Sequence, residues 1–88
     1  MIRLGKTIKR LRKARKLSLT DVARLSGIQL ATLSRIENNK MVGSLSCHLE
    51  LAKTLGMKLS EFFEEYEKDR TGVSETERQL LMTSRNFN

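Results

Sequence analysis

Positive side chains are the first feature of this sequence that could do chemistry, because they are crowded into its first half. Residues 1–44 contain eleven lysines and arginines against two acids, a net charge of +9; residues 45–88 contain six against eight, a net charge of −2, and the halves sum to the +7 of the chain. A basic half predicts a polyanionic partner, either nucleic acid or, less often, an anionic membrane. The alternative is a set of merely solvated basic residues.

Other reactive groups in the sequence do not form a site. Cys47 and His48 are adjacent, so on a helix their side chains point about 100° apart, and one cysteine with one histidine is too few for structural zinc. The acidic run at residues 61, 64, 65 and 67 is interpreted as a solvated face, and no phosphate-cradling glycine loop is present. We therefore expect no enzyme activity, no metal site and no cofactor.

Local signals predict two short helices joined by a tight turn at Gly27. Ser18 and Asp21 have the spacing of a capping box that begins a helix over residues 19–26, and Gly27 would end that helix in a left-handed conformation. The next helix begins within two residues of this glycine and runs to about residue 38. It is expected to end in Asn39, because asparagine tolerates the left-handed region.

The crossing of these two helices would leave one face of the second exposed. Ala23 is small enough for a close approach, while Leu33 and Ile36 would anchor the second helix against the first. The opposite face of the second helix then protrudes, and a helix about 10–12 Å across fits the major groove of B-DNA. This pair of helices therefore predicts a DNA-binding unit.

Together with its flanking segments, this unit resembles the phage repressor/Cro-like (Xre-type) helix-turn-helix domains. The resemblance covers about residues 4–66 and is carried by the segments LGKTIKRLRKARKLSLTDVA, SGIQLATLSRIENNK and SLSCHLELAKTLGMKLSEFF. It implies five helices, with the third as the recognition helix, and dimers that bind palindromic operators. The segments look most like the DNA-binding half of regulators that are fused to a sensor domain.

The resemblance also implies roles for individual positions. Residues expected to meet base edges lie on the outer face near the start of the third helix: Gln29, Leu30, Ala31, Thr32, Ser34 and Arg35. Residues expected to meet phosphates include basic residues of the first helix, and the set is Ser18, Asn38, Asn39, Lys40, Lys6 and Lys9. Arg12 is expected to pair with Glu37, which would tie the first helix to the end of the third.

Each of these roles has a simpler alternative. Gln29 could do no more than cap the third helix, and Lys6 and Lys9 could be solvated without touching a phosphate. Leu30 and Ala31 could serve packing or a protein partner, because an apolar outer face is not specific to DNA. Thr32 and Ser34 could likewise only solvate the outer face.

Apolar spacing and capping residues predict the first and fourth helices. Leu4, Ile8 and Leu11 form one stripe over a first helix of about residues 4–16. Ser44 would cap a fourth helix over about residues 45–55. The apolar residues expected on its buried face are Leu45, Leu49, Ala52 and Leu55.

The C-terminal part is predicted to hold one more core helix and a polar break. Ser60 would cap a fifth helix over about residues 61–68, and residues 69–72 would interrupt it. A capping box at Ser74 allows a short sixth helix through about Met82. The expected fold is all-α, a five-helix repressor-like domain over residues 1–68 with a tail or linker over residues 69–88.

These features predict a sequence-specific, double-stranded-DNA-binding transcriptional regulator that acts as a homodimer, with residues 30–38 as its recognition helix. Phe62, Phe63 and the sixth helix are the candidates for the dimer surface. The competing interpretations are a protein-interaction module, such as an antitoxin component, and a non-specific nucleic-acid binder. No secretory or membrane-spanning segment is recognised, so the cytoplasm is the expected location.

Overall fold

The structure is a computed structural model, which describes residues 4–71. Within those residues it contains five α-helices and no strand: α1 (Gly5–Ala14), α2 (Leu19–Ser26), α3 (Leu30–Glu37), α4 (Leu45–Thr54) and α5 (Leu59–Thr71). This confirms the all-α, five-helix prediction. The sixth helix expected over residues 74–82 lies outside the described residues.

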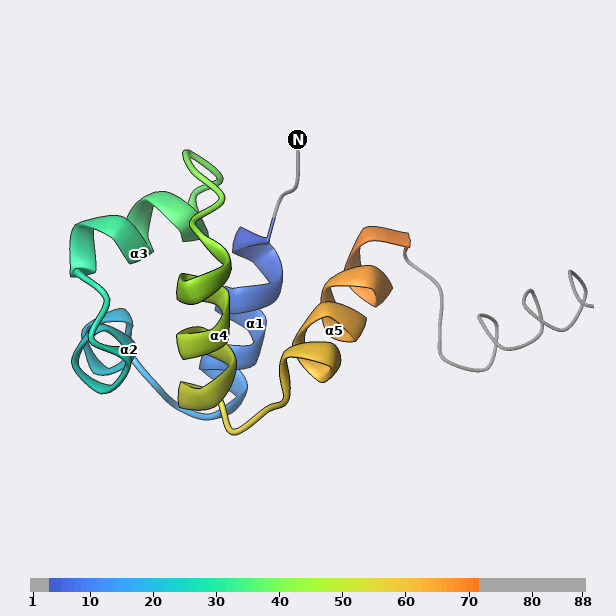
Figure 1. The fold of residues 1–88 in the computed structure, drawn as a ribbon, viewed down its shortest axis with the longest axis horizontal. Helices are drawn as coiled ribbons and strands as arrows, with labels where there is room; N and C mark the ends of the chain where they lie inside the picture. Colours follow the sequence, from blue (N-terminus) through green and yellow to red (C-terminus); the bar gives the residue numbers. More distant parts are fainter. Residues whose placement is uncertain (1–3, 72–88) are drawn as a thin grey trace, which may run out of the picture.

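The helices form one bundle with α2 and α3 at one end (Figure 1). Helix α5 packs against both α1 and α4, while α2 packs against α3 and α4. Five large side chains from different helices meet in the core with almost no exposure: Ile8, Val22, Leu33, Leu51 and Phe62. The predicted apolar stripe of the first helix is part of this core, since Leu4, Ile8 and Leu11 are all buried.

The predicted helix caps at the start of α2 and α4 are present. The Ser18 hydroxyl accepts a hydrogen bond from the Asp21 N–H at 3.0 Å, and the Asp21 carboxylate accepts one from the Ser18 N–H at 2.9 Å. The Ser44 hydroxyl accepts from the Cys47 N–H at 3.2 Å. These bonds satisfy backbone donors that a helix start otherwise leaves unpaired, which fixes where both helices begin.

The predicted buried face of α4 is wrong in part. Leu45 and Leu49 are 61% and 41% exposed, whereas His48 lies in the core together with Leu51 and Ala52. The helix is therefore turned so that residues 48, 51, 52 and 55 face inward. The reason is that the His48 ring packs against two aromatic residues of α5, with its centroid 6.3 Å from that of Phe62 and 5.8 Å from that of Phe63.

The bounds of α5 also differ from the prediction. The helix begins at Leu59, and Ser60 does not cap it; instead the Glu61 carboxylate accepts a hydrogen bond from the Lys58 N–H at 2.8 Å. It continues through the predicted polar break to Thr71. Helix α1 is shorter than predicted, because Lys16 adopts a left-handed φ of 58° in the turn that follows it.

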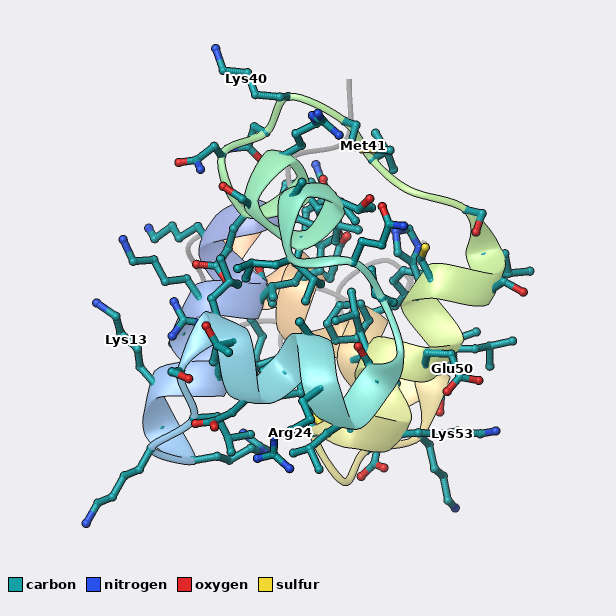
Figure 2. The ribbon with its side chains drawn as sticks, turned by 90° about the vertical axis from the view of Figure 1, so that its left-hand side faces the viewer. Lys13, Arg24, Lys40, Met41, Glu50 and Lys53 are labelled. Atoms are coloured by element: carbon teal, nitrogen blue, oxygen red, sulfur yellow. The ribbon has the colours of Figure 1, made fainter. Side chains whose placement is uncertain are left out.

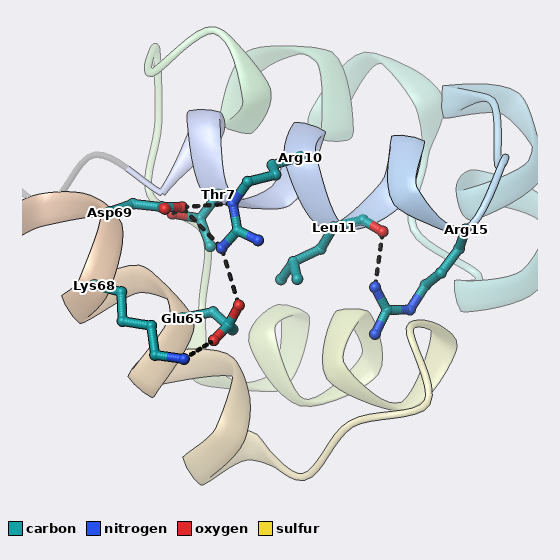
Figure 3. Close-up of polar contacts among 7 residues, drawn as sticks. All are labelled: Thr7, Arg10, Leu11, Arg15, Glu65, Lys68 and Asp69. Atoms are coloured by element: carbon teal, nitrogen blue, oxygen red, sulfur yellow. Dashed lines mark hydrogen bonds and ion pairs between the residues drawn. The ribbon is translucent and has the colours of Figure 1, made fainter. Parts of the chain in front are cut away.

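Polar contacts with α1 explain why α5 continues past residue 68 (Figure 3). The buried Thr7 hydroxyl donates to the Asp69 carboxylate at 2.8 Å. The Arg10 guanidinium donates to the same carboxylate at 3.1 Å and to Glu65 at 3.1 Å, and Lys68 forms an ion pair with Glu65. Asp69 is therefore held in place by α1, a partner some sixty residues away along the chain.

Acid is expected to weaken this contact between α1 and α5. The hydrogen bond from Lys68, and next that from Arg10, lowers the pKa of Glu65. A carboxylate whose pKa is lowered by folding adds stability above its unfolded pKa, and that stability is lost as the pH falls through its folded pKa. The free energy of unfolding by urea should thus fall from about pH 5 to about pH 2, and Glu65→Gln should reduce that fall. Parallel pH profiles for the two proteins would contradict this assignment.

Candidate nucleic-acid interface

Helices α2 and α3 form a rigid pair around a turn at Gly27. This glycine has a left-handed φ of 78°, and its N–H donates to the Ala23 carbonyl at 3.0 Å, which ends α2. Leu33 and Ile36 of α3 are each 1% exposed, as is Val22 of α2, so the inner face of α3 is packed into the core. Its outer face is left open.

The side chains predicted to meet base edges lie on or beside that outer face. Gln29, Leu30, Ala31 and Arg35 are exposed, whereas Thr32 and Ser34 are half-buried. Gln29 holds the N-cap position of α3 but makes no capping hydrogen bond with its side chain. Gln29 and Arg35 are the long polar side chains of the set, and their groups match those that pair with adenine and guanine.

The four predicted phosphate-binding residues outside α1 differ in how free their side chains are. The Asn38 amide donates to the Ser34 carbonyl at 2.8 Å, and the Asn39 side-chain oxygen accepts from the Gly5 N–H at 3.1 Å, so both asparagines already serve the fold. The Lys40 side chain extends away from the molecule (Figure 2). Ser18 is exposed but lies against the Asp21 carboxylate, whose negative charge opposes a phosphate.

An ion pair between Arg12 and Glu37 joins α1 to the end of α3. The guanidinium donates to both carboxylate oxygens, at 2.9 and 2.8 Å, and also to the Leu17 carbonyl at 2.9 Å. The two side chains are only 11% and 8% exposed. The hydrogen bond to Glu37 is the main cause that raises the pKa of Arg12. The pair therefore links three segments: α1, the turn before α2, and α3.

Gly5 shows how closely α1 approaches α3. A Cβ atom at this position would lie 2.0 Å from the Glu37 carbonyl oxygen and 3.0 Å from the Asn39 side-chain oxygen. Only a residue without a side chain allows the first turn of α1 to reach the end of α3. The orientation of α3 is thus set by its inner apolar face, by the Arg12–Glu37 pair and by this contact.

Ion pairing divides the basic residues of the described chain into two groups. Many are neutralised by acids within 4 Å, namely Arg10, Arg12, Arg24, Lys53, Lys68 and Arg70. Within residues 4–71, no such partner is found for the other eight, which are Lys6, Lys9, Lys13, Arg15, Lys16, Arg35, Lys40 and Lys58. Five of these eight are Arg35 of α3, Lys40 after it, and the three lysines at positions 6, 9 and 13 of α1. These five form what we call the open cation set.

The lysines of the open cation set lie toward one side of the molecule. The spacing of Lys6, Lys9 and Lys13 places them on one solvent-facing stripe of α1. In Figure 2, Lys13 and Lys40 point outward on the side where α1 lies, whereas Glu50 and Lys53 extend from α4 on the other side. Lys13 is not among the phosphate-binding residues predicted from the sequence. Arg10 also lies on α1, but Glu65 and Asp69 neutralise its charge, so it is not part of the open cation set.

Comparison with known proteins identifies the family. Residues 8–62, more than half of the chain, match the family model HTH_3, described as Helix-turn-helix. The chain belongs to the Xre-like helix-turn-helix family. This motif binds DNA in the proteins that define it, which agrees with the prediction that the chain is not an enzyme.

Two curated relatives support the same Xre-like helix-turn-helix assignment. Both are named HTH-type transcriptional regulator PuuR, one from Escherichia coli (strain K12) and one from Shigella flexneri. Each is 39% identical over 64 residues, which is 73% of this chain and 35% of the relative. The chain therefore spans about a third of the length of the curated relatives it matches.

A solved structure shares the fold. It is described as a SinR protein/SinI protein complex and aligns with a TM-score of 0.63 at 23% identity, over 99% of this chain and 96% of that one.

In the described part of this Xre-like chain, no group of three or more His, Cys, Asp or Glu side chains is placed to hold a metal ion. Nor does that part contain a helix of the length and apolarity needed to cross a membrane.

Proposed function

We propose that this chain is the sequence-reading domain of a transcriptional regulator and inserts α3 into the major groove of double-stranded DNA. The observation that carries the proposal is the open outer face of α3, with Gln29 and Arg35 exposed and the open cation set flanking it. Base edges would be read by Gln29, Arg35 and their neighbours, while Lys40 and the α1 lysines would bind phosphates and add affinity without sequence reading.

The regulator is proposed to act as a dimer on a palindromic site in the cytoplasm. Two copies of α3 would then lie about 34 Å apart, in successive major grooves. Family membership supports this proposal. The dimer surface lies outside Phe62, which is fully buried within the monomer, and Phe63 is packed against the same core. A sensor domain fused to this domain is part of the same proposal, and what supports it is that the match covers only 35% of the length of the curated relatives.

The two kinds of contact are expected to respond differently to substitution. Arg35→Ala should weaken binding to the preferred site by about 1–3 kcal/mol, roughly 5- to 150-fold, and relax the sequence preference at one position. Lys40→Ala should weaken binding to all sequences alike and reduce the dependence of log K on log salt by about one unit. Fluorescence anisotropy on preferred and scrambled duplexes at several salt concentrations measures both effects.

The outcome for Arg35 decides between the reading and positioning roles. If Arg35→Ala leaves both affinity and preference unchanged, Arg35 is not a base-reading residue. Lys53→Ala is the matched control, because this exposed lysine lies on α4 and is already paired with Glu50 at 3.8 Å. It should change neither the affinity nor the salt dependence.

A protein-interaction module is the second candidate, and one observation favours it. Leu30 is 45% exposed on the outer face of α3, where a protein partner could cover it as readily as a thymine methyl group. The solved structure that shares this fold is itself a complex with a second protein, SinI. This candidate takes first place if the chain binds duplex DNA with no sequence preference.

A further inference from the structure

The loop between α3 and α4, residues 38–44, carries Lys40 and is fixed at its two ends. At the start, Asn39 has a left-handed φ of 59° and accepts a hydrogen bond from α1, and the Lys40 N–H donates to the Arg35 carbonyl at 2.7 Å. At the end, Gly43 has a left-handed φ of 85° and lies against Ile36, whose Cδ1 would be 2.9 Å from a Cβ there. Between these points the loop has no helical hydrogen bonds to hold it.

His48 holds the middle of this loop from inside the core. Its Nε2 lies 2.7 Å from the Val42 carbonyl oxygen. A carbonyl oxygen only accepts hydrogen bonds, so Nε2 must carry the hydrogen and donate it. Val42 is two residues after Lys40. The hydrogen bond therefore connects the backbone beside the phosphate-binding lysine directly to the protein interior.

The surroundings of His48 make it a rigid anchor. His48 is only 6% exposed, and its ring meets the Phe63 ring edge to face. Both aromatic partners belong to α5, so the ring cannot follow the loop if the loop moves. A buried polar side chain in an apolar setting is costly unless it is hydrogen-bonded, and the Val42 carbonyl meets that need.

We propose that His48 is a positioning residue for DNA binding: it holds the Val42 carbonyl, so that the loop presents Lys40 to a phosphate. This inference rests on the proposed function. His48 does not touch DNA itself, because it is buried beneath the loop. It couples the phosphate contact after the recognition helix to the aromatic core of α4 and α5, which the sequence did not suggest.

The test is a double-mutant cycle between His48 and Lys40. His48→Phe keeps a ring in the core but removes the donor, and His48→Gln keeps a donor. Binding of the full chain to a 20-base-pair duplex (roughly two helical turns) is measured by fluorescence anisotropy at several salt concentrations. Urea unfolding of each variant establishes that it is folded under the binding conditions.

The expected result is coupling in both affinity and salt dependence. If Lys40→Ala weakens the wild-type chain about fivefold, it should weaken His48→Phe by less than about twofold. His48→Phe alone should already reduce the slope of log K against log salt by about one unit, the value expected for one lost phosphate contact. His48→Gln should restore part of that slope. Without DNA, the Lys40 N–H, which donates to the Arg35 carbonyl at 2.7 Å, should exchange faster in His48→Phe than in the wild-type chain.

Thr7→Val serves as the matched control for lost stability. Thr7 is 1% exposed, and its hydroxyl donates to Asp69 of α5 and not to the loop. It should lower stability but leave the salt dependence and the cost of Lys40→Ala unchanged. Additive effects of the His48 and Lys40 substitutions in a chain that binds DNA normally would overturn the role of His48 alone. Absence of DNA binding by the wild-type chain would overturn the proposed function with it.

Discussion

Glutamine in place of Glu37 is expected to lower the free energy of unfolding by about 3 kcal/mol. The substitution keeps the shape of the side chain but removes its charge, which leaves the Arg12 guanidinium in a site where it is only 11% exposed. A buried charge without its partner costs far more than a surface ion pair contributes. Urea unfolding followed by circular dichroism measures the change.

Arg24→Ala is the control for this first prediction. Its ion pair with Asp21 has a similar charge but is largely exposed, with a distance of 3.4 Å, so its loss should cost no more than about 1 kcal/mol. Equal small losses for the two variants would mean that the Arg12–Glu37 pair does not hold α1 to α3. A large loss for Glu37→Gln alone agrees with its burial and with its two hydrogen bonds to Arg12.

Alanine at Gly5 is expected to be destabilising by about 3 kcal/mol, although alanine favours helices more than glycine does. The new Cβ would overlap the Glu37 carbonyl oxygen at 2.0 Å, and a backbone atom cannot swing aside as a long side chain can. Either α1 or the end of α3 must move. We therefore expect weaker DNA binding by the folded fraction as well, since the loop that carries Lys40 follows directly.

Gly27→Ala separates this overlap from ordinary backbone strain. Gly27 has a left-handed φ of 78°, but nothing lies within 4 Å of a Cβ placed there. Its substitution should cost only the strain of a left-handed alanine, about 1–2 kcal/mol. Thermal and urea unfolding compare the two variants. Gly5→Ala with a stability at or above that of Gly27→Ala would contradict the close approach of α1 to α3.

Parts of the fold that depend on neighbouring residues could be predicted from the sequence. Ser18 and Asp21 act at the start of α2 and Gly27 acts at its end, in each case through neighbouring residues, so local sequence alone predicts both ends of this helix. The inner face of α3 followed from the spacing of Leu33 and Ile36, both of which are buried. Its outer face could then be predicted as the side that remains.

Parts that depend on distant partners could not be predicted in the same way. A histidine is not an obvious core residue, so the burial of His48 required knowledge of Phe62 and Phe63 on another helix. The continuation of α5 required the contact between Asp69 and Thr7. Likewise, the charge of a lysine or arginine is visible in the sequence, but whether an acid neutralises it is not: Arg10 is paired, whereas Lys9 beside it is not.

Selection from a random pool of double-stranded DNA, at about 150 mM salt and followed by sequencing, tests the central claim most directly. We expect recovery of a palindromic motif with half-sites about one helical turn apart. Arg35→Ala should change the motif at one base of each half-site, while Lys40→Ala should recover the same motif with lower affinity. Recovery of no motif, with binding that only follows the salt concentration, would contradict sequence reading by α3.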